Sequence, residues 1–195
     1  MATEILNERE LYPSYEIIGG KKIMAPSAAP THGRVIMRLG TIIENYLYEN
    51  NLGYVFADDV DVYFSDGTLF KPDLSIVLKK NSAIIDWRRG IYGAPDMVVE
   101  ILSYSTRKKD LTIKKDIYEA NGVREYWIID TWAKIIDVYL LRDGKYFLDD
   151  EYMLPDEKDL ELMTDEEKSV IKHEVPVSII EGLKIPLEFV FSWGI

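Results

Sequence analysis

Apolar residues recur along this chain with the spacings of both helices and strands. Over residues 32–49 they stand three and four positions apart, which predicts a helix with one apolar face and with Thr31 as its N-cap. A Gly19-Gly20 pair between two β-prone runs predicts a hairpin over 15–24. Further strands are expected at 54–56, 60–64, 69–78, 95–102, 124–130, 133–141, 145–148 and 170–180.

With a second helix expected at about 106–120, this order predicts an α/β (α+β) fold with a mixed central sheet flanked by helices. The N-terminal hairpin and the C-terminal strands would be additions to that sheet. The 195 residues are expected to form one domain. Residues 149–168 are expected to be a solvated acidic insertion, with helix around 155–169. Residues 81–91 would form a short helix or a lid.

One of the predicted strands carries a carboxylate among apolar residues. Residues 95–102 are apolar on both faces, which is typical of a buried strand, and strand alternation places Glu100 on one face with Val98 and Leu102. A buried carboxylate is costly unless it meets a cation or a metal. Glu100 is therefore either a metal ligand or the partner of Lys114 or Arg107 in a buried ion pair, whereas Asp96 is expected to be structural.

Two further side chains are candidates to meet Glu100. On a helical wheel, Lys114 falls within the apolar arc of the second helix, whereas Lys115 falls on the polar side. Lys114 is thus predicted to face the sheet, or to extend past the edge of the core into solvent. Asp73 follows Pro72, which interrupts strand pairing, and is either a turn residue or a second acid beside Glu100. Two acids and a lysine could hold a divalent ion that activates water against a phosphate.

Composition narrows the choice of ion and of partner. The chain has no cysteine and two histidines, which excludes thiolate zinc sites and histidine-rich cages and favours hard ions held by carboxylates. No signal peptide and no membrane-spanning run are recognised, so we expect a cytoplasmic protein with no membrane partner. The net charge of −11 argues against binding of nucleic acid over an extended basic surface. However, residues 149–168 hold ten acidic and two basic residues, and therefore most of that excess.

Three segments carry a more specific similarity: Lys71-Pro72-Asp73, the stretch Ala-Pro-Asp-Met-Val-Val-Glu-Ile-Leu-Ser at 94–103, and Gly-Val-Arg-Glu-Tyr-Trp-Ile-Ile-Asp at 122–130. Together with Ser105-Thr106-Arg107 and Lys114 they resemble the Uma family of restriction endonucleases, in the restriction-endonuclease-like PD-(D/E)XK superfamily. The resemblance implies the corresponding fold, DNA as substrate and Mg²⁺ or Mn²⁺ as cofactor.

The resemblance also implies roles for individual residues. Asp73 and Glu100 would bind the metal and Lys114 would assist, because Leu102 stands where the superfamily usually has its lysine. Glu16 would add a carboxylate behind the metal ligands or at a second metal, whereas His32 is interpreted first as part of the start of a helix. Cutting both strands of DNA would suit a homodimer. Two alternatives stay open: a catalytically inactive binding or assembly module that keeps the site as ion pairs, and hydrolysis of a small phosphoester.

Overall fold

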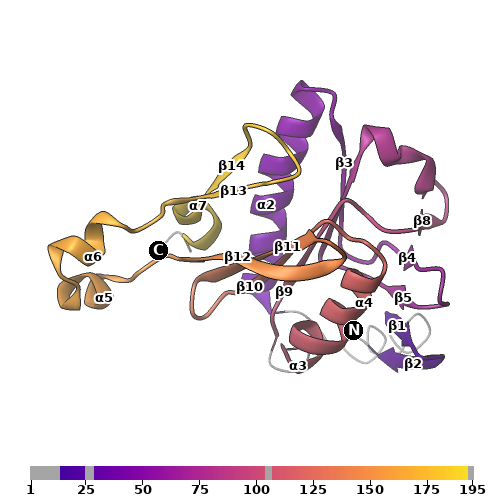
Figure 1. Cartoon of the computed structure of the whole chain (residues 1–195), viewed down its shortest axis with the longest axis horizontal. Coiled ribbons are helices and arrows are strands. Elements are labelled where there is room, and N and C mark those ends of the chain that lie inside the picture. Colours follow the sequence, from indigo (N-terminus) through magenta and orange to yellow (C-terminus); the bar gives the residue numbers. More distant parts are fainter. Residues whose placement is uncertain (1–13, 25–28, 104–106, 193–195) are drawn as a thin grey trace, which may run out of the picture.

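The computed structural model describes residues 14–24, 29–103 and 107–192 (Figure 1). Its larger sheet has the strand order β12-β11-β10-β9-β6-β3, and a second sheet has the order β2-β1-β5-β4-β8-β7. The strands of the larger sheet are β3 (Gly53–Ala57), β6 (Leu74–Leu78), β9 (Met97–Ile101), β10 (Glu125–Asp130), β11 (Ile135–Arg142) and β12 (Lys145–Met153). Those of the second are β1 (Tyr15–Ile18), β2 (Lys21–Met24), β4 (Val62–Tyr63), β5 (Leu69–Phe70), β7 (Ile85–Asp86) and β8 (Gly90–Tyr92).

Helices flank these sheets, and a small hairpin of β13 (Glu174–Pro176) and β14 (Lys184–Pro186) completes the described part. The α-helices are α2 (Pro30–Glu49), α3 (Arg107–Lys109), α4 (Lys115–Ala120), α5 (Glu157–Leu162), α6 (Asp165–Ser169) and α7 (Leu187–Phe191). A 3₁₀ helix, η1, covers Lys79–Ile84, and a π-helix, η2, covers Asp110–Lys114. The predicted class, a mixed sheet flanked by helices, is confirmed.

Strand β9 lies at the centre of the larger sheet. It pairs antiparallel with β6 and parallel with β10. A parallel pair needs a crossover connection, and the helical segment over 107–120 lies between β9 and β10 in the chain. Alternation along β9 sends Val99 towards the core under α2, while Val98 packs with Tyr118 and Phe70 on the opposite face. The buried stripe of α2 is Val35, Ile36, Leu39, Ile43 and Leu47.

Several predicted boundaries differ from the structure. The N-cap of α2 is Ala29 rather than Thr31, because Pro30 begins the helix with a fixed φ and no N–H to satisfy. The expected strand over 69–78 is divided at Pro72 into β5 and β6, which belong to different sheets. Residues 170–180 supply only the three-residue β13. Residues 25–28 of the predicted loop, and Ser105 and Thr106 of the family motif, lie outside the described residues.

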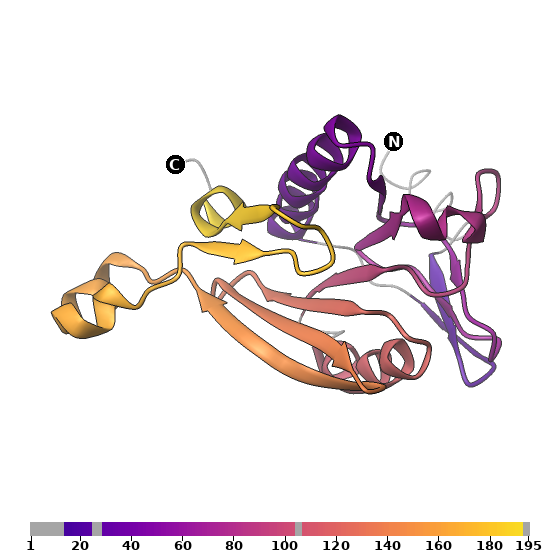
Figure 2. The same ribbon diagram turned by 45° about the horizontal axis from the view of Figure 1, so that its top comes forward.

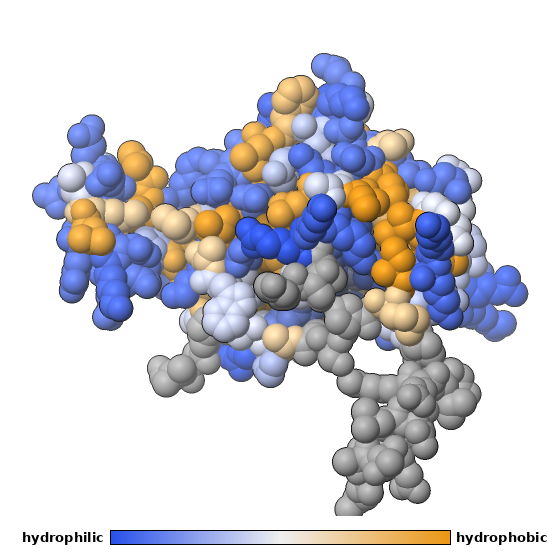
Figure 3. Space-filling model, turned by 90° about the horizontal axis from the view of Figure 1, so that it is seen from below, coloured by the Kyte–Doolittle hydropathy of each residue, from blue (hydrophilic) through white to orange (hydrophobic). Residues whose placement is uncertain are grey.

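The acidic segment is only partly helical. Its first residues extend β12 to Met153, and α5 and α6 follow, each begun by a capping box. Neither short helix buries a residue, and Figure 2 shows the pair projecting from one end of the molecule. In the view from below, Figure 3 shows this projection as mainly hydrophilic with isolated apolar side chains. Of the short helix or lid expected over 81–91, the first residues are helical as the end of η1, and the rest form the β7–β8 hairpin.

Asp96, just before β9, joins three central strands. Its carboxylate accepts a hydrogen bond from the Leu78 N–H at 2.6 Å and pairs with Arg124 at 2.6 Å. We predict that Asp96→Ala lowers the free energy of unfolding by about 2–3 kcal/mol, because the buried N–H loses its acceptor. Urea denaturation measures the effect, with exposed Asp116→Ala as a control expected to change stability by less than about 0.5 kcal/mol. Equal midpoints for the two variants would contradict this role.

Candidate active site

Glu100 lies in the middle of β9 and is 3% exposed. Both of its carboxylate oxygens lie 2.9 Å from Nζ of Lys114, and the Tyr118 hydroxyl donates to Oε1 at 2.6 Å. Tyr118 is itself fully buried, in the helix that follows Lys114. The carboxylate that the strand pattern singled out is therefore held by a lysine and a tyrosine from the helical crossover.

The π-helix η2 shapes this contact. It widens the backbone over 110–114, so an α-helical wheel is correct for some side chains here and wrong for others. Lys114 is buried as the wheel predicted, but Ile113, placed by the wheel in the apolar arc, is 47% exposed. Asp110 is buried on the same turn, with Oδ1 3.4 Å from Nζ of Lys114. Asp110 belongs to the motif that resembles the family, but no role was predicted for it, although the same wheel places it between Ile117 and Lys114.

Glu16 reaches the cluster from the second sheet. It lies on β1, where it is the buried residue of an otherwise half-exposed strand. Its Oε1 lies 2.8 Å from Nζ of Lys114, and its Oε2 pairs with Lys109. Glu16 therefore lies at the candidate site, where it forms an ion pair with Lys114, the lysine that also pairs with Glu100.

Asp73 faces Glu100 across two neighbouring strands. The register of β6 with β9 pairs Leu74 with Val99, so Asp73 comes opposite Glu100. Its Oδ2 accepts a hydrogen bond from the Ile101 N–H at 2.5 Å, and its Oδ1 lies 3.1 Å from Nε2 of His32. His32 therefore does more than begin α2, because its imidazole contacts a candidate ligand from the face opposite Lys114.

The cluster gathers more acidic than basic side chains. Glu16, Asp73, Glu100 and Asp110 are buried around Lys114, with Lys109 at the edge. The pKa of Glu100 is raised to about 8, chiefly by burial and also by Asp110, Asp73 and Glu16, against the opposing effect of Lys114. Burial raises the pKa of Glu16 as well, but Lys114 and Lys109 outweigh burial and lower it below its ordinary value.

The basic groups respond in the opposite direction. Burial alone would lower the pKa of Lys114, yet Glu100, Glu16 and Asp110 raise it well above the ordinary value. Burial likewise lowers the pKa of His32, but its hydrogen bond and charge interaction with Asp73 raise it overall. Lys114 is therefore held in its charged form, and the excess of acidic side chains around it is felt as the raised pKa of Glu100.

The donor set fits a hard divalent cation by type and by charge. Carboxylate oxygens are the ligands that magnesium and manganese prefer, and Asp73 and Glu100 present them from adjacent strands. The surplus of carboxylates over lysines is a charge that such a cation would neutralise. In the arrangement described, Lys114 lies against Glu100, and no group of three or more acidic or histidine side chains within the described residues surrounds a common point. A cation would therefore compete with Lys114 for the oxygens of Glu100.

The raised pKa of Glu100 has a consequence for stability. The native protein keeps this proton up to pH about 8, whereas the unfolded chain releases it near the ordinary pKa of about 4.3. Between these values the native state binds more protons, so this contribution to stability is complete below pH 4 and is lost as the pH rises towards 8. Glu100→Gln cannot titrate. Relative to the wild type, its free energy of unfolding should therefore rise with pH, by at most about 1.4 kcal/mol per pH unit.

Urea denaturation of both proteins at pH 5, 6.5 and 8 without metal measures this difference. Asp116→Asn, an exposed acid on the same helical segment, is the matched control, and its difference from the wild type should not change over this range. A Glu100→Gln difference that is equally constant with pH would show that Glu100 is ionised throughout.

Two comparisons with known proteins bear on this site. The fold is similar to that in the crystal structure of a putative nuclease belonging to DUF820 from Anabaena variabilis ATCC 29413, with a TM-score of 0.69 and 22% sequence identity. The similarity covers 93% of this chain and 91% of that one, and at this identity it establishes the fold. No curated protein matches the chain. The model of the Uma2 family, described as a putative restriction endonuclease, matches residues 5–167. The resemblance seen in the motifs is confirmed, and the chain belongs to the Uma2 family of putative restriction endonucleases.

Proposed function

We propose that this protein is an endonuclease that hydrolyses phosphodiester bonds in DNA with the help of Mg²⁺ or Mn²⁺. The observation that carries the proposal is the pair of acids, Asp73 and Glu100, on neighbouring strands beside buried Lys114. Membership in a family of putative restriction endonucleases supports hydrolysis of nucleic acid. The surplus of buried carboxylates supports the need for a divalent cation.

Each residue of the cluster has a distinct task in this proposal. Asp73 and Glu100 would hold the cation, which when bound supplies an activated water and charge neutralisation at the phosphate. Lys114 orients the attacking water or stabilises negative charge on the phosphate, since its ammonium already lies 2.9 Å from Glu100. Glu16 positions that ammonium from the opposite side, and Tyr118 restricts the rotation of Glu100.

Lys114 can serve this chemistry although it lies on the crossover helix and not on the strand, where the superfamily usually has its lysine. Leu102 occupies the position two residues after Glu100, and it packs against the apolar core on the face of α4. Lys114 approaches the same carboxylate from the crossover helix instead. Because catalysis depends on where the ammonium lies and not on which element carries it, the helix can supply the group that the strand lacks.

The acidic net charge does not oppose DNA binding at this site. Figure 1 shows α5 and α6, which carry much of the acidic segment, at the opposite end of the molecule from α3 and β1. Charges separated by more than about 10 Å are largely screened at moderate ionic strength. Arg107 and Lys108 are exposed on α3, close in the chain to Lys114, where they could contact backbone phosphates.

No helix among the described residues is long and apolar enough to cross a membrane.

We include in this proposal that the 195 residues act as one nuclease domain, and that two copies pair so that both DNA strands can be cut. Analytical ultracentrifugation with and without duplex DNA tests the pairing, which a monomer under both conditions would contradict.

Replacing either acid by its amide tests the proposed mechanism. Glu100→Gln and Asp73→Asn should each reduce metal-dependent nicking of supercoiled plasmid at least 100-fold, because each replaces a carboxylate, which a bound cation would keep ionised, by a neutral amide. Circular dichroism should show unchanged folding, and exposed Asp116→Asn should cut like the wild type. Unchanged nicking by either well-folded amide variant would overturn the mechanism.

Lys114→Met separates ion binding from chemistry. Removing the ammonium takes a competing positive charge from Glu100, so manganese should bind more tightly while nicking falls at least 100-fold. The same change leaves buried carboxylates without their lysine and should cost about 3–5 kcal/mol of stability, part of which manganese restores. Calorimetric titration and plasmid nicking are the two measurements. Weaker manganese binding in this variant would contradict the proposed competition.

One observation favours a second function. Lys114 already pairs with Glu100, Glu16 and Asp110, so each of these three carboxylates has a cationic partner without any metal. A protein that kept this network for stability alone could be a binding or assembly module on a nuclease fold. Calorimetric titration of the wild type with manganese separates the two functions. Millimolar or tighter binding that disappears in Glu100→Gln supports the nuclease, and no binding supports the module.

A further inference from the structure

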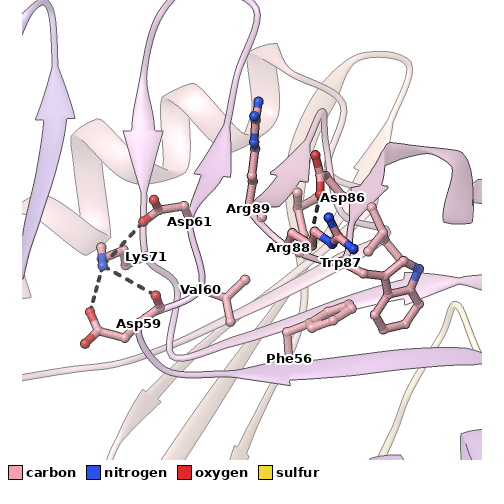
Figure 4. A pocket seen from close by; sticks show the side chains of 12 residues that line it. Phe56, Asp59, Val60, Asp61, Lys71, Asp86, Trp87, Arg88 and Arg89 are labelled. Carbon is pink, nitrogen blue, oxygen red and sulfur yellow. Dashed lines mark hydrogen bonds and ion pairs between the residues drawn. The ribbon is translucent and has the colours of Figure 1, made fainter.

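A second site adjoins the candidate active site on the same face of the larger sheet. A cavity of about 310 Å³ is lined by Phe56 of β3, by the segment before β4, by Lys71 just after β5, and by the β7–β8 hairpin (Figure 4). Its lining includes Phe56, Trp87, Arg88, Arg89 and Lys71. A cavity of this size lies at the lower end of those that take small molecules. None of these residues has a role in the proposed catalytic cluster.

The position of the cavity follows from strand register. Phe56 pairs with Ser75 across β3 and β6, and Ser75 is two residues from Asp73. Residues two apart on a strand share a face and are separated by roughly 7 Å. Phe56 therefore lies on the same face as Asp73, one step along the sheet. At the near end of the cavity, Asp59 lies beside Asp58, whose N–H donates to the Asp73 carbonyl at 3.1 Å.

One end of the cavity is an exposed aromatic surface. Trp87 is 67% exposed, although its ring packs edge-on against Tyr54 with centroids 5.0 Å apart and against Phe56 at 5.9 Å. These contacts fix the orientation of the indole while leaving much of it open to solvent. A large aromatic ring held in this way is suited to stacking against a flat ligand.

The cavity is lined by three aspartates and three basic residues, of which the two arginines are the exposed cations that could meet an anion. Asp59 and Asp61 pair with Lys71 at 2.9 and 3.3 Å, and an oxygen of Asp86 accepts the Arg88 backbone N–H at 2.9 Å. The guanidinium groups of Arg88 and Arg89 are exposed, and within the part of the chain that the structure describes neither has an acidic partner. Figure 4 shows both extending from the turn that also carries Trp87.

We propose that this cavity binds one unpaired nucleotide of the substrate strand, next to the phosphate that is cleaved. The base stacks on Trp87 and Phe56, and Arg88 and Arg89 contact the adjoining phosphates. The inference rests on the proposed nuclease function and specifies its substrate class as single-stranded DNA, or duplex DNA with an unpaired or extruded nucleotide at the cleavage site. Because every base has a π-face, the cavity imposes little sequence preference at that position.

Binding measured without cleavage tests this site. In EDTA, a single-stranded oligonucleotide carrying 2-aminopurine should bind the wild type with quenched fluorescence, and a fully paired duplex should bind at least tenfold more weakly. Trp87→Ala should remove the quenching and weaken binding at least fivefold. Trp132→Ala removes a tryptophan that is 89% exposed in the β10–β11 turn, and is the matched control expected to bind and quench like the wild type.

The arginines provide a second test that does not disturb the packing of Trp87. Replacing Arg88 and Arg89 together by alanine should weaken single-strand binding and reduce the slope of its salt dependence by about 1.4, because two phosphate contacts are lost. Arg142→Ala, an exposed arginine paired with Asp149 on β12, should leave both unchanged. Wild-type binding that is equal for single strands and duplex, or that is unaffected by both the Trp87 and the arginine changes, would overturn the inference.

The outcomes distinguish this site from the proposed function. If the wild type shows no metal-dependent nicking while the oligonucleotide still binds through Trp87, the nucleotide site stands and the nuclease function fails. If plasmid nicking depends on Glu100 but the cavity variants bind and cut single strands like the wild type, the nuclease stands and the nucleotide site fails.

Discussion

The buried ammonium of Lys114 is the interaction on which the site depends. It lies within 3.4 Å of Glu100, Glu16 and Asp110, and so compensates carboxylates that would otherwise be too costly to bury. One lysine cannot neutralise all of these carboxylates. The negative charge that remains on the neighbouring acids contributes to the raised pKa of Glu100. A buried cluster with more carboxylates than basic groups favours the binding of a cation. This is the physical reason to interpret the cluster as more than a structural ion pair.

The fold brings these groups together from four separate parts of the chain. Central strand β9 supplies Glu100, and the start of β6 supplies Asp73 one strand away. The π-helical turn in the crossover supplies Asp110 and Lys114, and β1 of the second sheet supplies Glu16. The division at Pro72 is important here, because it ends β5 in one sheet and lets β6 begin in the other with Asp73 at the junction.

The same junction relates the candidate active site to the cavity beside it. Lys71 lines the cavity and Asp73 faces Glu100, so only Pro72 separates the two sites in the chain. Proline fixes φ and donates no hydrogen bond, which makes it suited to a position where the chain leaves one sheet for another. A substrate strand crossing this junction would meet the acidic cluster on one side and the aromatic and guanidinium groups on the other.

The sequence by itself determined the class of fold and the central buried strand. It also determined that this strand carries the carboxylate of Glu100 and that Lys114 faces it. These features follow from the spacing of apolar residues, which repeats every two residues in strands and about every 3.6 residues in helices, and which can be seen within short segments of the sequence. The motif resemblance added the family and favoured one of the two alternatives for Asp73, an acid beside Glu100. Local pattern could not show that the crossover contains a π-turn, and the α-helical wheel therefore placed Lys114 correctly but Ile113 wrongly.

Only the tertiary structure decided which distant groups surround Glu100. The contacts of Glu16 and His32 with the cluster depend on sheet pairing and helix docking over long separations in the chain, and no local spacing encodes them. The surplus of negative charge, and with it the raised pKa of Glu100, likewise exists only when carboxylates from β1, β6, β9 and η2 are buried together. Electrostatic energies in a buried site depend on three-dimensional distance and on exclusion of water, and these are properties of the folded chain.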